Sequence, residues 1–145
     1  MAYPNPVPGL VIRYSYLWAH EYQRGLEEGL KDRPCAIVLV ATDTGDGQEV
    51  TVLPITHTPP SDPRLVVEIP MSVKQRLRLD HERSWVVLSE ANRFFWPGPD
   101  LRPVAMGDMA SVSYGPLPYA LFEDIRQKFI SAIRARRAQR IPRSE

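Results

Sequence analysis

The sequence predicts an α+β domain in which a strongly bent antiparallel sheet, or small open β-barrel, carries a short helix and a C-terminal amphipathic helix. Three observations predict this class. Two apolar, β-branched runs flank an Asp/Gly-rich turn within residues 32–60, which is the pattern of a β-hairpin. Further short apolar runs follow, and the 15 prolines and 8 glycines of the chain indicate many short elements joined by turns. Near the C-terminus apolar residues recur every four positions, which favours an amphipathic helix.

Length and composition favour a single domain. A chain of 145 residues suits one modest core, and we expect one domain over residues 1–145. The net charge of +1 gives no overall field that attracts nucleic acid, so RNA binding requires a local patch. The one cysteine, Cys35, excludes an internal disulfide and a cysteine-based zinc cluster. No run can span a bilayer and no signal pattern opens the chain, so we expect a cytoplasmic protein without a membrane partner.

The first part of the chain predicts an arm, a strand and a loop. Residues 1–8 contain three prolines and predict a flexible arm. Residues 10–16 alternate well enough to form the first strand. Residues 18–32 are polar, contain two glycines, and predict a long loop with at most one helical turn. Loops of this length in small domains are usually functional or mobile.

The middle of the chain predicts the hairpin and two short elements. The hairpin covers residues 35–56, and its first strand is almost entirely apolar, which predicts burial on both faces. Residues 59–63 are too rich in proline for regular structure, and residues 65–69 predict a short strand. We expect Ser72 to cap a short helix.

The last part predicts strands, a helix and a basic tail. Residues 84–88 form an apolar strand with a polar exit at 89–93, and residues 110–114 form a further strand. The amphipathic helix is expected over residues 119–140, and its arginine-rich end belongs to a basic tail over residues 134–145. Cations at a helix C-terminus offset the helix dipole, which explains this tail without nucleic acid.

Polar residues mark the open end of the predicted hairpin. Arg33 precedes its first strand, Thr56 and His57 close its second, and antiparallel pairing brings these ends together. A guanidinium holds phosphate oxygens bidentately, a hydroxyl can donate to them, and histidine can transfer protons near neutral pH. We therefore expect chemistry on a phosphate here. Pairing of Arg33 with Asp32 or Glu28 is the alternative that the residues leave open.

Three short segments, in their order and spacing, resemble the MazF/PemK (Kid) family of toxin endoribonucleases. They are Pro-Gly-Leu-Val-Ile-Arg-Tyr at 8–14, Arg33-Pro34 opening an apolar strand, and Pro-Ile-Thr-His at 54–57 closing the next. The resemblance covers about residues 8–96. It implies a small SH3-like, MazF-like barrel that forms a homodimer, cuts single-stranded RNA without a metal or cofactor, and is blocked by an antitoxin protein.

The resemblance also implies roles for individual residues. Arg33 matches the family's catalytic arginine and would stabilise transition-state charge, while Thr56 matches a threonine that would position the phosphate. The family pattern does not require His57, and Glu90 lies where some members carry an acidic residue, so either could take the 2′-hydroxyl proton. RNA contacts are expected from Asn92, Arg93, Trp18 and His20.

We expect no metal site, because neither His20 nor His81 has a spaced partner. The homodimer has a further basis in the C-terminal helix, whose apolar face is wider than a lone barrel end needs. That face contains Leu121, Phe122, Ile125, Phe129 and Ile133. Two other functions stay open: a non-catalytic protein-binding toxin of the same fold, as in gyrase-poisoning toxins, and an inactive dimeric interaction module.

Overall fold

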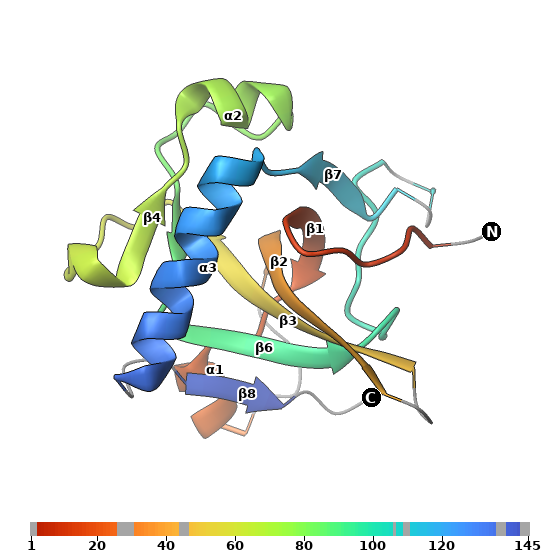
Figure 1. Ribbon diagram of the computed structural model, residues 1–145. Helices are drawn as coiled ribbons and strands as arrows, with labels where there is room; N and C mark the ends of the chain where they lie inside the picture. Colours follow the sequence, from red (N-terminus) through yellow and green to blue (C-terminus); the bar gives the residue numbers. More distant parts are fainter. Residues whose placement is uncertain are drawn as a thin grey trace.

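The computed structural model confirms the α+β class and the strongly bent antiparallel sheet (Figure 1). The sheet curls into a half-barrel, and a few helices accompany it. No helix among the described residues is both long and apolar enough to cross a membrane. The structure describes residues 3–25, 31–43, 47–105, 107–108, 111–135 and 139–142.

The sheet is built around β3 (Gly47–Thr56). Along one edge it pairs antiparallel with β2 (Asp32–Asp43), which confirms the predicted hairpin. Along the other edge its first half pairs with β6 (Glu90–Phe95), and its last two residues pair with β5 (Trp85–Val87). Strands that pass from one set of neighbours to another make the corners of curled sheets, and β3 does this here.

The remaining strands extend the sheet from both sides of the hairpin. β1 (Leu10–Ser15) pairs with β2, and β7 (Ser113–Pro116) pairs with β1. At the opposite end, β4 (Val66–Glu68) pairs with β5 and forms an edge. β8 (Gln139–Pro142) pairs in parallel with β6. The sequence predicted a helix through residue 140, which is wrong, because residues 139–142 form a strand of the sheet.

Within the described residues, three short helical segments connect the strands. α1 (Ala19–Gln23) is the single helical turn predicted in the long loop, whose residues 26–30 lie outside the described part. A 3₁₀ turn, η1 (Pro63–Leu65), precedes β4. α2 (Met71–Arg76) begins directly after Pro70, so Ser72 lies inside the helix and the predicted serine cap is wrong. Pro70 occupies the N-cap position, with φ of −58° and ψ of 146°, and its side chain forms no capping hydrogen bond.

The C-terminal helix, α3 (Tyr119–Arg134), packs across one face of the sheet (Figure 1). It ends at Arg134 rather than at residue 140. Phe122, Ile125 and Phe129 are buried in the core between the helix and the sheet, and the partly buried Leu121 and Ile133 pack against this core. The apolar face that we expected to join two chains is therefore covered within one chain, and the area argument for a homodimer is wrong.

Both faces of β2 are covered over residues 35–38, as the apolar strand predicted, whereas Leu39 is 43 % exposed. Ala36 and Val38 of β2 belong to the core beneath α3. Cys35 and Ile37 belong to a second core on the other face, where the Tyr14 ring stacks on Phe94 with centroids 4.6 Å apart.

Residues 3–6, within the segment predicted to be a flexible arm, lie against this second core. Tyr3 packs on it, and Pro6 is buried. The indole Nε1 of Trp96 donates to the carbonyl oxygen of Pro4 at 3.0 Å. A half-buried indole N–H needs an acceptor, and the N-terminal segment supplies it.

Candidate functional site

A pocket of about 460 Å³ lies where β2 begins and β3 ends. Four of the predicted site residues line it together: Arg33, Thr56, Trp18 and His20. The segment of residues 58–62, called the pocket wall below, closes one side, and the rest of the lining comes from Leu65, Val66, Val87 and Ser89. The antiparallel hairpin thus brings Arg33 and Thr56 together, as the sequence predicted.

Arg33 has no ion-pair partner among the described residues and lines this pocket. Its Cζ lies 4.9 Å from the ring centroid of Trp18, within the range of a cation–π interaction. Nη1 makes only a long contact of 3.5 Å with the carbonyl oxygen of Ile55, and the buried Nε has no hydrogen-bond partner among the described residues. A guanidinium half-buried in this way favours an anion that accepts from its free donors.

Asp32 and Glu28 were the alternative ion-pair partners of Arg33. Asp32 is engaged elsewhere: its carboxylate lies 3.7 Å from Nη2 of Arg13 and 3.6 Å from Nε of Arg102. Pairing of Arg33 with Asp32 is therefore excluded, while Glu28 lies outside the described residues.

Thr56 supplies a hydroxyl at the end of β3. Its Oγ1 accepts from the backbone N–H of Thr58 at 3.1 Å. Because an alcohol oxygen accepts and donates independently, the hydroxyl hydrogen can still be donated to an oxygen in the pocket.

Trp18 and His20 are placed by a chain segment whose backbone is held by buried side chains. Asn92 on β6 is fully buried, and its side chain forms two hydrogen bonds with Leu17, accepting from the backbone N–H at 2.9 Å and donating to the carbonyl at 2.8 Å. The Glu21 carboxylate accepts from the N–H of Trp18 at 3.0 Å. Asn92 thus orients the segment that carries the indole, and it has no surface with which to contact RNA, contrary to the sequence prediction.

Glu90 completes this support. It opens β6 instead of ending the preceding strand, which corrects the sequence prediction. Its Oε1 accepts from the backbone N–H of Ala19 at 2.9 Å and from the hydroxyl of Tyr16 at 3.1 Å. Burial raises the pKa of the Glu90 carboxyl, and the two hydrogen bonds offset this only in part. Glu90 lies behind the pocket-lining segment and is not one of the lining residues.

Arg93 lies on the opposite face of β6 from Asn92, because neighbouring side chains alternate along a strand. It is half-buried and does not line the pocket. Its Nε is buried without a partner among the described residues. The predicted RNA contact of Arg93 would therefore need a surface other than this pocket.

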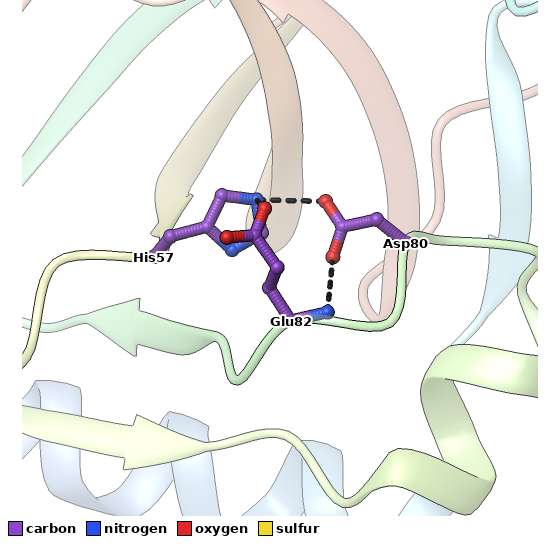
Figure 2. Close-up of side chains that lie close together, drawn as sticks. All are labelled: His57, Asp80 and Glu82. Carbon is purple, nitrogen blue, oxygen red and sulfur yellow. Dashed lines mark hydrogen bonds and ion pairs between the residues drawn. The ribbon is translucent and has the colours of Figure 1, made fainter.

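His57 turns away from the pocket and toward the loop that precedes β5 (Figure 2). Its Nε2 lies 2.7 Å from Oδ2 of Asp80 and 3.7 Å from Oε2 of Glu82. Its Nδ1 lies 3.1 Å from both the carbonyl oxygen of Arg83 and Oγ of Ser84. No local sequence pattern predicts this group, because more than twenty residues separate the histidine from its partners.

A buried lysine anchors the same network. Lys74 of α2 is 1 % exposed, and its ammonium donates to Oδ1 of Asp80, to the carbonyl oxygen of Glu82, and to Oγ of Ser84 at 2.6 Å. Partial burial raises the pKa of Asp80, but hydrogen bonds from Lys74 and from the N–H of Glu82 outweigh it, so the pKa lies below its ordinary value.

His57, Asp80 and Glu82 form a group of potential metal ligands that the sequence did not predict. Their ligand atoms lie within 4.8 Å of one another. However, the Lys74 ammonium is bonded to the Asp80 carboxylate and would repel a divalent cation placed there. A network of ion pairs accounts for the arrangement without a metal.

Comparisons with known proteins give no further guide: no protein-family model matches the chain, and a search of curated proteins gives no match. The chemistry available in the pocket is that of a guanidinium, a hydroxyl, an imidazole and an indole. The first two groups bind phosphate oxygens, and an indole can stack on a nucleobase.

Proposed function

We propose that this chain is a metal-independent endoribonuclease of the MazF/PemK type, which cuts single-stranded RNA in the pocket at the open end of the β2–β3 hairpin. The observation that carries the proposal is the Arg33 guanidinium, which stacks on Trp18 beside Thr56 and has no anionic partner among the described residues. Two residues named from the family resemblance thus share one pocket with an aromatic surface suited to a base.

In this reaction the 2′-oxygen of the RNA attacks the adjacent phosphorus. The bond to the 5′-oxygen of the next nucleotide breaks, leaving a 2′,3′-cyclic phosphate and a 5′-hydroxyl. Arg33 stabilises the negative charge that builds on the phosphorane oxygens, and Thr56 donates a hydrogen bond to one of them. These roles need no metal or cofactor.

Proton transfer is assigned to His20 rather than to His57. Among the described residues, His20 is the histidine that lines the pocket, whereas both ring nitrogens of His57 face groups of the Asp80 network. Glu90 is assigned a supporting role, because its Oε1 already accepts two hydrogen bonds. The proposal extends to an SH3-like barrel, a homodimer and an antitoxin partner, which rest on the family resemblance.

The test is cleavage of a mixed-sequence single-stranded RNA by the purified chain in the presence of EDTA. Arg33→Ala is expected to slow cleavage by about 10²–10³-fold, the usual effect of removing one donor that stabilises transition-state charge. Arg76→Ala is the matched control, because Arg76 is exposed on α2 and does not line the pocket. RNA with 2′-deoxy sugars should resist cleavage.

Three outcomes would contradict the proposal. Cleavage by Arg33→Ala within a few-fold of the unchanged chain would show that the reaction occurs elsewhere. Inhibition by EDTA that magnesium reverses would indicate metal-assisted hydrolysis. Failure of the chain to cut any RNA, with the fold intact, would favour a non-catalytic protein-binding toxin or an inactive interaction module.

A further inference from the structure

A second set of cations lies at the start of β2, outside the pocket lining. Nη2 of Arg13 and Nε of Arg102 lie 3.7 and 3.6 Å from the carboxylate oxygens of Asp32. Side chains alternate along a strand, so Asp32 and Arg33 point to opposite faces of β2, and none of Arg13, Asp32 and Arg102 lines the pocket. These four residues and the exposed Lys31 are called the basic rim.

The two guanidinium groups outside the pocket are held by backbone carbonyls and keep free donors. Nη1 of Arg13 donates to the carbonyl oxygen of Pro103 at 3.1 Å. Nη1 of Arg102 donates to that of Pro99 at 2.9 Å. The Asp32 carboxylate lies beyond hydrogen-bond distance of both groups. Each group has five N–H donors, so donors remain for an anion, and little further ordering of the side chains is needed to bind it.

The basic rim has a local excess of positive charge. Four of its five residues are cations and one is a carboxylate, which gives a net charge of +3. The whole chain has a net charge of only +1, so the rest of the chain is net negative. With the buried Asp100 included, which lies two positions before Arg102, the cations still outnumber the acids. A polyanion is therefore attracted to the rim rather than to the molecule as a whole.

Further ionisable groups near the rim are paired or neutral. On the pocket wall, the carboxylate of Asp62 is paired with Arg64 at 3.0 Å. Asp80 is paired with the ammonium of Lys74. Tyr114 of β7 interacts with the charges of two rim residues, but burial raises the pKa of its phenol, so this group stays uncharged near neutral pH. These groups leave the positive charge of the rim in place.

The position of the cations restricts the kind of polyanion that can reach them all. Arg33 faces one side of the strand, and the Arg13–Arg102 pair faces the other, so a shared ligand must bend around the start of β2. A single-stranded nucleic acid can bend in this way, whereas a duplex has a persistence length of about 50 nm. Phosphates accept bidentate hydrogen bonds from guanidinium groups, and the Trp18 indole in the pocket provides a stacking surface for a base of the same strand.

We propose that the basic rim binds backbone phosphates of single-stranded RNA on the face of β2 opposite the pocket. The inference rests on the proposed ribonuclease function for the identity of the polymer. It adds that the substrate extends beyond the bond that is cut, with one phosphate at Arg33 and neighbouring phosphates at Arg13 and Arg102. Its test measures binding without cleavage, so its failure can be told from failure of the ribonuclease function.

The test is fluorescence anisotropy of a labelled, mixed-sequence single strand with 2′-deoxy sugars, which the proposed reaction cannot cut. Arg13→Gln and Arg102→Gln should each weaken its binding to the full chain about five-fold at about 0.1 M salt, the contribution of counterion release from one phosphate of a single strand. Each should also reduce the slope of log K against log salt by about 0.7. Arg126→Gln is the matched control, because it removes one charge from α3, where Arg126 is paired with Glu123 at 2.8 Å. It should change neither quantity.

Asp32→Asn tests the rim in the opposite direction. It removes the carboxylate that competes with phosphate for the two guanidinium groups, so binding of the same strand should become a few-fold tighter. A folding defect cannot produce tighter binding. This variant therefore keeps the inference open to refutation even if an arginine variant is poorly folded.

The inference is overturned if Arg13→Gln and Arg102→Gln bind the strand as the Arg126→Gln control does. It is also overturned if a duplex of the same length binds as tightly as the single strand. Competition by poly-glutamate equal to that of the nucleic acid would assign the rim to an acidic protein segment instead. A chain that cuts no RNA but shows the expected effects of the rim variants would support the rim as a single-strand site and contradict only the proposed ribonuclease function.

Discussion

Replacing Asn92 by alanine tests whether this side chain supports the fold or contacts a ligand. Asn92 is 0 % exposed, and its amide forms hydrogen bonds of 2.9 and 2.8 Å with the backbone N–H and carbonyl oxygen of Leu17. In Asn92→Ala both backbone groups lose their partner. Leu17 is itself only 2 % exposed, so water cannot readily replace the lost amide.

The magnitude follows from the two groups left unsatisfied. Each buried polar group without a partner costs about 1–3 kcal/mol, so Asn92→Ala should lower the free energy of unfolding by about 2–6 kcal/mol. For a chain of this size 1 kcal/mol corresponds to about 2–4 °C in the melting temperature. A loss of about 4 kcal/mol, the middle of this range, gives a decrease of about 8–16 °C.

The assay is urea denaturation followed by circular dichroism, in which the midpoint should fall while the slope is unchanged. Asn5→Ala is the matched control, because Asn5 is exposed and its replacement should change stability by less than about 0.5 kcal/mol. A change for Asn92→Ala as small as that of the control would refute the structural role of Asn92. It would also restore ligand contact as the explanation for its presence.

Two further predictions concern Glu90 and the oligomeric state. Because burial raises the pKa of Glu90, the folded chain keeps this proton to a higher pH than the unfolded chain, so stability should fall as pH rises from the unfolded toward the folded pKa. Glu90→Gln, whose amide oxygen can still accept from Ala19 and Tyr16, should remove this part of the pH dependence of the urea midpoint; an identical profile would refute the assignment. The proposed homodimer predicts a mass of two chains in sedimentation equilibrium at micromolar concentration, and a monomer with full ribonuclease activity would exclude it.

The sequence alone predicted the parts of the fold that local pattern determines. The apolar runs around the Asp/Gly turn predicted β2 and β3. The recurrence of apolar residues at every fourth position predicted the start and the buried face of α3. The meeting of Arg33 and Thr56 in one pocket followed as well, because antiparallel pairing fixes which ends of a hairpin are neighbours.

Tertiary structure decided the features that depend on partners distant in the chain. Asn92 was predicted as a ligand contact, but its partner Leu17 lies 75 positions away, and a buried amide cannot be told from an exposed one in a polar segment. His57 was predicted beside Arg33, but its imidazole pairs with Asp80 at 2.7 Å and does not line the pocket. The parallel pairing of β8 with β6 likewise has no local signature. Hydrophobic periodicity and turn-forming residues involve positions that are close in the sequence. The partner of a buried polar group depends instead on how the whole chain folds.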